Sequence, residues 1–258
     1  MTRGAASLLL LLPLLLVAIG ACAPNGGGGG DGAAPAPRPA PRPTSGDVLI
    51  LGDSVMAWNE DEGASVADAL RDVRGGRVTS RAVPGATLLG PERERIGAGY
   101  APDDWTWVVV QGGANDLVGR CGCGPCDPTL DRLLAPDARS GVVADLVTRI
   151  RQDGAAVALW SYHDVLPRAP FPFGRCGDDA AVMRERFARL AGRDPGVVVI
   201  DGRAALDPSR PANYDRDGVH PSPAGSRAIA KQLARAFDAA DATVAGATPA
   251  EAARESTD

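Results

Sequence analysis

Short apolar runs alternate with longer stretches of mixed polarity through most of the chain. Short apolar runs bounded by turn residues are typical of strands buried in a parallel sheet. They lie at 48–51, 107–110, 155–160 and 197–200, with a weaker one at 77–83. The intervening stretches have the length and apolar spacing of amphipathic helices, at about 61–73, 140–153, 179–192 and 223–238. The alternation predicts an α/β domain with a central parallel sheet and helices on both faces.

The N-terminal segment has the features of an export signal. An apolar run at 8–19 has the length of a signal-peptide core and is too short for a membrane-spanning helix. It ends in Ile19-Gly20-Ala21-Cys22, which resembles the lipobox of bacterial lipoproteins. The resemblance implies cleavage before Cys22 and lipidation of its thiol, so that the exported protein is anchored to a membrane and faces the periplasm or the cell exterior. Ordinary cleavage after Ala21, with Cys22 as a free thiol, is the alternative.

These features predict four regions along the chain. Residues 1–21 form the signal peptide, and 22–46 form a tether rich in Gly and Pro that begins with the lipidated cysteine. The folded domain spans 47–239. The polar, alanine-rich residues 240–258 are expected to be a disordered tail.

Composition excludes several classes of protein. Hydrophobic residues make up 45% of the 258 positions and charged residues 23%, which excludes a wholly disordered chain and a polytopic membrane protein. The net charge is −5, and no run of Lys or Arg is present, so the sequence does not favour nucleic-acid binding. We expect a monomer.

Candidate catalytic residues follow the predicted strands. Ser54 follows the first strand, Gly85 the second and Asn115 the third, while Asp217 and His220 follow the last. Each is ordinary by itself, because Asp and Ser cap helices and Gly and Asn form turns. The carboxyl ends of parallel strands meet at one edge of the sheet, however, so these side chains should converge. A carboxylate that orients an imidazole beside a serine makes that serine a nucleophile.

In order and spacing these residues resemble the GDSL/SGNH hydrolase superfamily, and the resemblance covers essentially all of 47–238. Gly-Asp-Ser at 52–54, Gly-Ala-Asn-Asp at 113–116 and Asp-Gly-Val-His-Pro at 217–221 match closely, whereas the segment around Gly85 matches most loosely. The resemblance implies a three-layer, flavodoxin-like SGNH hydrolase fold. The chain has no Gly-x-Ser-x-Gly motif, which makes the α/β-hydrolase fold less favoured.

The resemblance also implies specific roles. Ser54 would be the nucleophile, His220 the base and then the acid, and Asp217 the carboxylate that orients His220. The backbone N–H groups of Ser54 and Gly85 and the side chain of Asn115 would form the oxyanion hole. The resemblance implies no cofactor and no metal ion.

Three further polar residues lie near these motifs. Asp215 is a rival for the orienting carboxylate, but its spacing to His220 does not match the superfamily. Asp116 is expected to be a structural hydrogen-bonding residue. His163, the other histidine of the chain, is expected at the surface or beside the substrate rather than as the base.

Four cysteines remain when Cys22 is set aside. An even number of cysteines in an exported protein favours two disulfides, and three pairings are open. A metal site is the competing interpretation. One bridge is expected to join the insertion at 119–139 to the loop at 162–178 and to form a wall of the cleft. The four are Cys121, Cys123, Cys126 and Cys176.

The sequence therefore predicts a serine esterase that acts on short acyl esters, such as O-acetyl groups on cell-envelope glycans. Lysophospholipids or other long-chain esters are the alternative substrates. An O-acyltransferase would use the same three catalytic residues, because both reactions pass through an acyl-enzyme. A non-catalytic envelope-binding lipoprotein is the remaining hypothesis, and it requires an unreactive Ser54.

Overall fold

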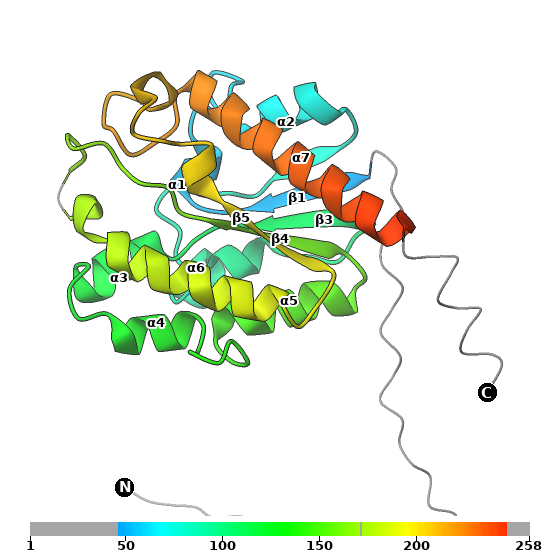
Figure 1. Ribbon diagram of the computed structural model, residues 1–258, viewed down its shortest axis with the longest axis horizontal. Coiled ribbons are helices and arrows are strands. Elements are labelled where there is room, and N and C mark those ends of the chain that lie inside the picture. The colour runs from blue at the N-terminus through cyan, green and yellow to red at the C-terminus, as the bar shows by residue number, and fades with distance from the viewer. Residues whose placement is uncertain (1–45, 171, 247–258) are drawn as a thin grey trace, which may run out of the picture. The chain divides into compact units, whose positions relative to one another are not determined.

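The computed structural model describes residues 46–170 and 172–246 (Figure 1). The predicted signal peptide, Cys22, the tether before Gly46 and the end of the tail after Gly246 lie outside these ranges. None of the helices within the described ranges is both long and apolar enough to cross a membrane.

Five parallel strands form the central sheet in the order β2-β1-β3-β4-β5 (Figure 1). This order confirms the predicted flavodoxin-like α/β fold. All five apolar runs become strands, although the weak second one shortens to three residues. The strands are β1 (Asp47–Leu51), β2 (Val78–Ser80), β3 (Trp105–Val110), β4 (Ala156–Ser161) and β5 (Val197–Asp201).

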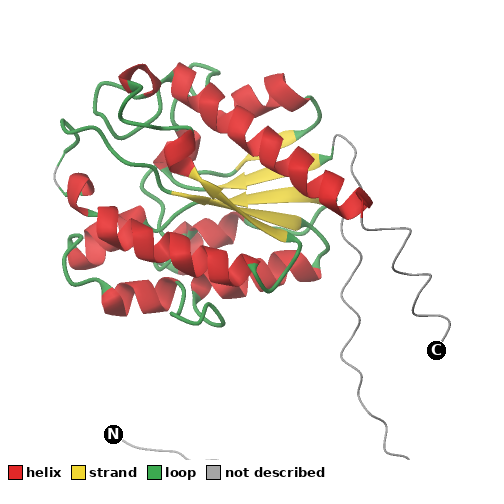
Figure 2. Ribbon diagram, in the orientation of Figure 1, coloured by secondary structure: helices red, strands yellow, loops and turns green. Residues whose placement is uncertain are grey.

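Helices cover both faces of the sheet, as Figure 2 shows. One apolar core lies between the sheet and α1, α2 and α7, and a second lies between the opposite face and α3 to α6. The helices are α1 (Ser54–Ala57), α2 (Val66–Arg74), α3 (Ala114–Cys121), α4 (Asp127–Leu133), α5 (Val142–Gln152), α6 (Gly177–Ala191) and α7 (Pro223–Gly246). Short 3₁₀ turns lie at Glu92–Glu94, Ile96–Gly99, Phe173–Arg175, Gly202–Ala204 and Pro211–Asn213.

The predicted helix boundaries differ from the structure by more than two residues at two places. α2 begins at Val66 rather than near 61, because Ser65 and Asp68 form a capping box that fixes its first turn. α7 runs to Gly246, eight residues beyond its expected end at 238. The helix therefore includes the first residues of the segment that we expected to be a tail.

Candidate active site

Ser54 is the first residue of α1, directly after β1. Gly52 makes the tight connection, because a Cβ there would lie 2.7 Å from Gln111 Oε1 and 2.8 Å from Met56 Cγ. Asp53 caps the helix, and its carboxylate accepts a hydrogen bond of 3.0 Å from the backbone N–H of Val55. The Ser54 N–H belongs to the first helical turn and has no intrahelical acceptor.

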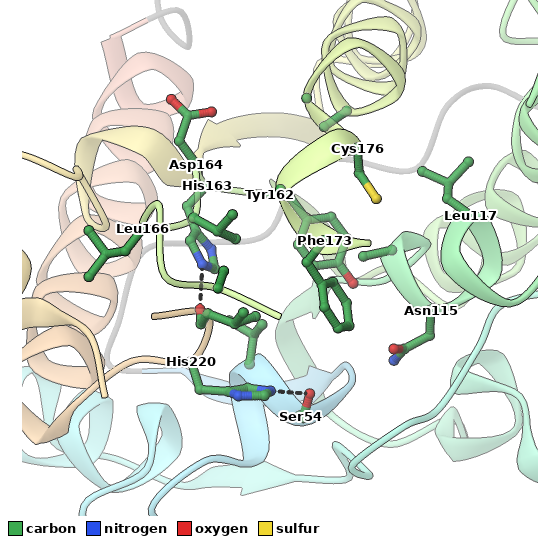
Figure 3. A pocket seen from close by; sticks show the side chains of 18 of the residues that line it. Ser54, Asn115, Leu117, Tyr162, His163, Asp164, Leu166, Phe173, Cys176 and His220 are labelled. Carbon is green, nitrogen blue, oxygen red and sulfur yellow. Dashed lines mark hydrogen bonds between the residues drawn. The ribbon is translucent and has the colours of Figure 1, made fainter. Parts of the chain in front are cut away.

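Ser54, His220 and Asp217 form a continuous hydrogen-bonded chain. His220 Nε2 lies 2.8 Å from Ser54 Oγ (Figure 3), and His220 Nδ1 donates to Asp217 Oδ2 at 2.5 Å. This geometry places the imidazole proton on Nδ1 and leaves Nε2 free to accept the serine proton. The structure thus brings together all three residues that the resemblance implies.

Hydrogen bonds within its own turn keep the Asp217 side chain ionised. Its Oδ1 accepts hydrogen bonds from the backbone N–H groups of Val219 at 2.9 Å and His220 at 3.0 Å. Burial acts to raise the pKa of Asp217, but the hydrogen bonds from His220 and from the backbone outweigh it, and the pKa lies below its usual value. A carboxylate that stays ionised can orient the imidazole and stabilise its positive charge.

Asp215, the rival carboxylate, has a different partner. Its Oδ2 accepts a hydrogen bond of 2.6 Å from the indole Nε1 of Trp58, and its Oδ1 accepts one from the backbone N–H of Arg216. Asp217, not Asp215, is therefore the carboxylate that contacts the His220 ring.

Asn115, in the first turn of α3, lines the same pocket as Ser54 and His220 (Figure 3). Its Nδ2 donates to the carbonyl of Ala86 at 3.0 Å and, through a longer hydrogen bond of 3.5 Å, to Asp53 Oδ2. Gly85 has a φ of +77° in the turn after β2 and lines an adjoining cavity that Asn115 also borders. Of the expected oxyanion-hole residues besides Ser54, Gly85 thus lies in the turn after β2 and Asn115 at the start of α3, and Asn115 is the one that reaches the Ser54 pocket.

Asp116, also in α3, holds the segment after β2 against the start of that helix. Its buried carboxylate accepts hydrogen bonds of 2.8 Å from the backbone N–H groups of both Leu88 and Leu89, and Arg120 lies 3.8 Å away. Burial raises the pKa of Asp116 despite these contacts. This is the structural role that the sequence indicated.

Asp53 and Tyr162 are site residues that the sequence analysis did not single out. The hydroxyl of Tyr162, just past the end of β4, donates to Asp53 Oδ2, and Gln111 Oε1 accepts from the Asp53 backbone N–H at 3.0 Å. Burial raises the pKa of Asp53, while the hydrogen bonds of Tyr162, Val55 and Gln111 oppose the shift. The position of Asp53 within Gly-Asp-Ser was the only available signal, since Tyr162 is 109 residues away.

His163 is buried, so a surface location is wrong, but it does line the pocket. Its Nε2 donates to the Val219 carbonyl at 2.7 Å, and no partner of Nδ1 is found among the described residues. Burial lowers the pKa of His163 to about 4.

The pocket beside Ser54 has a volume of about 340 Å³. Apolar side chains from α3, from the loop after β4 and from the His220 loop form much of its wall (Figure 3). They include Leu117, Val165, Leu166, Phe173 and Val219, and Ala180 of α6 adds to the same wall.

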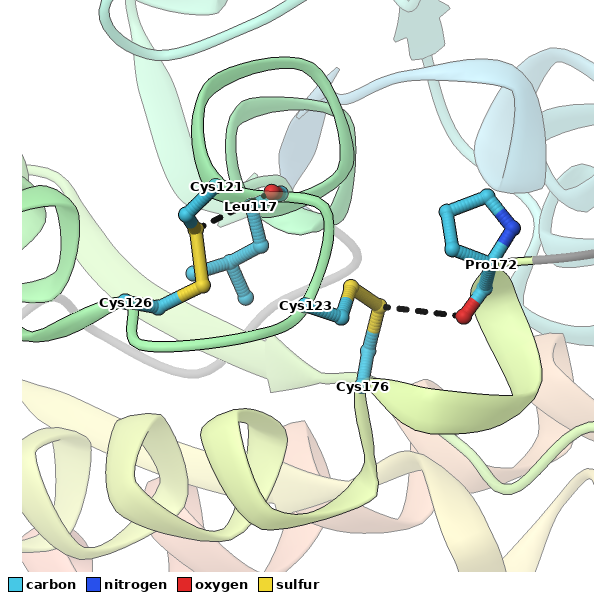
Figure 4. The surroundings of a disulfide bond; sticks show 6 residues. All are labelled: Leu117, Cys121, Cys123, Cys126, Pro172 and Cys176. Carbon is cyan, nitrogen blue, oxygen red and sulfur yellow. Dashed lines mark hydrogen bonds between the residues drawn. A yellow bond between two sulfur atoms is a disulfide. The ribbon is translucent and has the colours of Figure 1, made fainter.

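Two disulfides form in this part of the domain, and one of them contributes to the wall of the pocket (Figure 4). Cys121 pairs with Cys126 within the insertion, and Cys123 pairs with Cys176. The second bridge joins the insertion to the loop after β4, as expected, and Cys176 itself lines the pocket. Within the described ranges, no group of three or more His, Cys, Asp and Glu side chains is arranged to hold a metal ion.

Comparison with known families agrees with this fold. The model of the GDSL-like Lipase/Acylhydrolase family matches residues 50–228, which is more than half of the chain. The chain therefore belongs to the GDSL-like lipase/acylhydrolase family. No curated protein matches the chain.

Solved structures with the same fold include proteins of several organisms. A protein of Slackia heliotrinireducens, provisionally assigned to the SGNH hydrolases, is 27% identical with a TM-score of 0.55, and the match covers 75% of this chain and 100% of that one. LAE5, an alpha/beta hydrolase enzyme from the Lake Arreo metagenome, is 21% identical with a TM-score of 0.53, and the match covers 77% of this chain and 96% of LAE5. A carbohydrate esterase family 2 enzyme of Corynascus (Myceliophthora fergusii) is 18% identical with a TM-score of 0.54, and the match covers 79% of this chain and 68% of that enzyme.

Proposed function

We propose that this protein is a serine carboxylic ester hydrolase with Ser54 as nucleophile, His220 as general base and acid, and Asp217 as the orienting carboxylate. The observation that carries the proposal is the chain of hydrogen bonds from Asp217 through His220 to Ser54 Oγ. The family to which the chain belongs supports acyl hydrolysis as the type of reaction.

The geometry supports a two-step reaction. His220 Nε2 takes the proton from Ser54 Oγ as that oxygen attacks the ester carbonyl, and the imidazolium then protonates the departing alcohol. The Ser54 N–H group and the Asn115 amide stabilise the negative charge on the carbonyl oxygen in the intermediate, and the resemblance adds the N–H group of Gly85 from the adjoining turn. Water activated by His220 then hydrolyses the acyl-enzyme, whereas transfer to a sugar hydroxyl would make the protein an O-acyltransferase.

The volume of the pocket bears on the acyl group of the substrate. A cavity of about 150 Å³ holds a benzene molecule, and the pocket beside Ser54, at about 340 Å³, is more than twice that size. Its apolar wall favours an acyl chain of several carbons over an acetyl group. We therefore place longer-chain esters, the alternative raised by the sequence, before O-acetyl esters.

O-acetyl esters of envelope glycans stay the second candidate. Their support is the predicted export signal, the lipobox-like sequence at 19–22 and the tether, which would hold the domain near the cell envelope. We propose that the protein is exported and anchored to a membrane at the cell envelope, with Cys22 as the lipidated residue. Incorporation of labelled palmitate by the intact chain, and its loss in Cys22→Ser, tests the anchor.

Hydrolysis of p-nitrophenyl esters from acetate to palmitate tests the enzymatic proposal. The protein, prepared under oxidising conditions, should hydrolyse at least part of the series, and Ser54→Ala should abolish that activity. A peak at medium or long chains supports the pocket argument, and a peak at acetate supports glycan O-acetyl esters. A folded protein whose Ser54 does not react with any ester or with a fluorophosphonate would instead favour the binding lipoprotein.

Two neighbouring aspartates provide a matched test of the orienting role. Asp217→Asn should lower kcat by about 10²–10⁴, because the amide no longer fixes the reactive tautomer of His220. Asp215→Asn, two residues away, should cost only a few-fold. Equal losses in the two variants would contradict the assignment of Asp217.

A further inference from the structure

The indole of Trp58 lies flat against the imidazole of His220. The ring centroids are 3.8 Å apart and the ring planes differ by 5°. Trp58 is the C-cap residue of α1, the four-residue helix that begins with Ser54. The same short helix therefore provides the proposed nucleophile, Ser54, and the indole that stacks against the proposed base, His220.

Hydrogen bonds on both sides of the stack fix the indole. Trp58 Nε1 donates to Asp215 Oδ2 at 2.6 Å. The next residue, Asn59, donates from Nδ2 to the carbonyl of Pro221 at 3.0 Å and to Ser226 Oγ at 3.2 Å. The Asn59 contacts hold the end of α1 against the segment that follows His220, and the indole cannot turn away from the imidazole without breaking its own bond to Asp215.

The stack has a chemical consequence during turnover. In the proposed reaction His220 gains a proton and becomes a cation, and the face of an indole attracts a cation electrostatically. The ring also covers one side of the imidazole, which keeps its plane aligned with Ser54 Oγ. The other titratable groups that act on His220 are Asp217 on its own loop, Asp53 at the start of α1 and His163 after β4.

We propose that Trp58 is a positioning residue that aligns the His220 ring and stabilises its protonated form, and that Asp215 acts on catalysis only through Trp58. The inference rests on the function proposed above. Trp58 need not touch the substrate for this role. Asp215, which the sequence suggests as an alternative carboxylate partner of His220, instead holds the stacked indole through its hydrogen bond to Trp58 Nε1.

Two substitutions distinguish an electrostatic role of the indole face from a role in which Trp58 only covers the imidazole. Trp58→Phe keeps an aromatic ring, whereas Trp58→Leu keeps an apolar cover without π-electrons. We expect Trp58→Leu to lower kcat/KM by about three- to thirtyfold, the range of a cation–π contact, and Trp58→Phe to stay nearer to the wild type. Thermal unfolding checks that each variant is folded, and Trp58→Met replaces the leucine variant if that one is not.

The titration of His220 gives a readout that does not depend on activity. The chain has two histidines, so the ring protons of both can be followed by NMR in the full chain without a histidine tag, with His220→Ala to assign the signals. The titration midpoint of His220, and the acid limb of kcat/KM, should lie about half a pH unit or more lower in Trp58→Leu than in Trp58→Phe. A packing role alone would not separate these two midpoints.

A double-mutant cycle tests the place of Asp215. Asp215→Ala should lower kcat/KM in the wild type by part of the Trp58→Leu loss, and it should have no further effect in the Trp58→Leu background. A further loss in that background would overturn the proposal that Asp215 acts through Trp58.

Failure of this inference differs from failure of the proposed function. A wild-type protein that hydrolyses no ester contradicts the proposed function, and the NMR midpoints still test the stack. Equal kcat/KM values or equal midpoints in Trp58→Leu and Trp58→Phe would overturn the role of the aromatic face in an active enzyme.

Discussion

The hydroxyl of Tyr162 donates a hydrogen bond to the carboxylate of Asp53, the residue directly before the proposed nucleophile. The contact connects the end of β4 to the N-terminus of α1, across the sheet edge on which the site is built. Asp53 is buried, so the loss of a donor to its carboxylate is costly.

Tyr162→Phe should lower the free energy of unfolding by about 1–3 kcal/mol at pH 7. Tyr162 opposes the upward shift of the Asp53 pKa, so its removal raises that pKa further in the folded state alone. The variant's deficit should therefore shrink as the pH falls through the raised folded-state pKa of Asp53, first in the variant and then in the wild type, because the unfolded state is the same for both. Urea unfolding at several pH values measures this difference.

Tyr214→Phe is the matched control for that measurement. The Tyr214 hydroxyl donates to the backbone carbonyl of Asp164 at 2.6 Å, and a carbonyl does not titrate. The deficit of this variant should stay nearly constant over the same pH range. Parallel curves for the two variants would show that Asp53 does not carry the effect.

Asn115→Ala should keep the fold and lower kcat by about 10²–10³, the usual effect of removing one oxyanion-hole donor. The side chain also donates to the Ala86 carbonyl, so a small loss of stability is expected as well. Steady-state kinetics with the best p-nitrophenyl ester measures the effect. An activity within threefold of the wild type would remove Asn115 from the oxyanion hole.

The two disulfides should differ in their contribution to stability. Cys123–Cys176 spans 53 positions and Cys121–Cys126 spans five, so chain-entropy arguments give about 4 kcal/mol for the first and about 2 kcal/mol for the second. Thermal unfolding of the paired serine variants checks this order. Only loss of the longer bridge should broaden chain-length selectivity, because Cys176 and Phe173 line the pocket.

Acid should destabilise the fold through His163. Its pKa is about 4 in the folded protein and 6.5 in the unfolded chain, so the unfolded state binds the proton first. The contribution of this group to the free energy of unfolding, about 3 kcal/mol, is fully present above pH 6.5 and is lost as the pH falls towards 4. His163→Gln should lack this component, and its urea midpoint relative to the wild type should rise as the pH falls. Asp53 and Asp116, whose raised pKa values act in the opposite sense, are common to both proteins.

The sheet could be predicted because its strands are buried on both faces and are therefore apolar throughout. Three helices were missed. α1 has only four residues, and α3 begins inside a Gly-Ala-Asn-Asp sequence whose Gly, Asn and Asp are also typical of a turn. α4 lies in the cysteine-rich insertion, where Cys126 precedes it and a proline occupies its first turn. Short helices of this kind depend on tertiary packing more than on the periodicity of their own residues.

The convergence of Ser54, Asn115, Asp217 and His220 could be predicted, because parallel strands bring their carboxyl ends to one edge. The contacts of Tyr162 with Asp53 and of Trp58 with His220 could not. Each joins residues more than 100 positions apart, and no local pattern indicates which residue either aromatic side chain contacts. The disulfide pairing also depended on the positions of two loops that cysteine spacing does not determine.

The hydrogen bond between Ser54 and His220 joins residues 166 positions apart. During synthesis on the ribosome, the serine emerges early, and its histidine follows only after all five strands have been made. A nascent or truncated chain therefore contains the hydroxyl without the imidazole that activates it. Esterase activity should appear only when the whole domain has been translated and folded, which makes it a direct reporter of completed chain assembly.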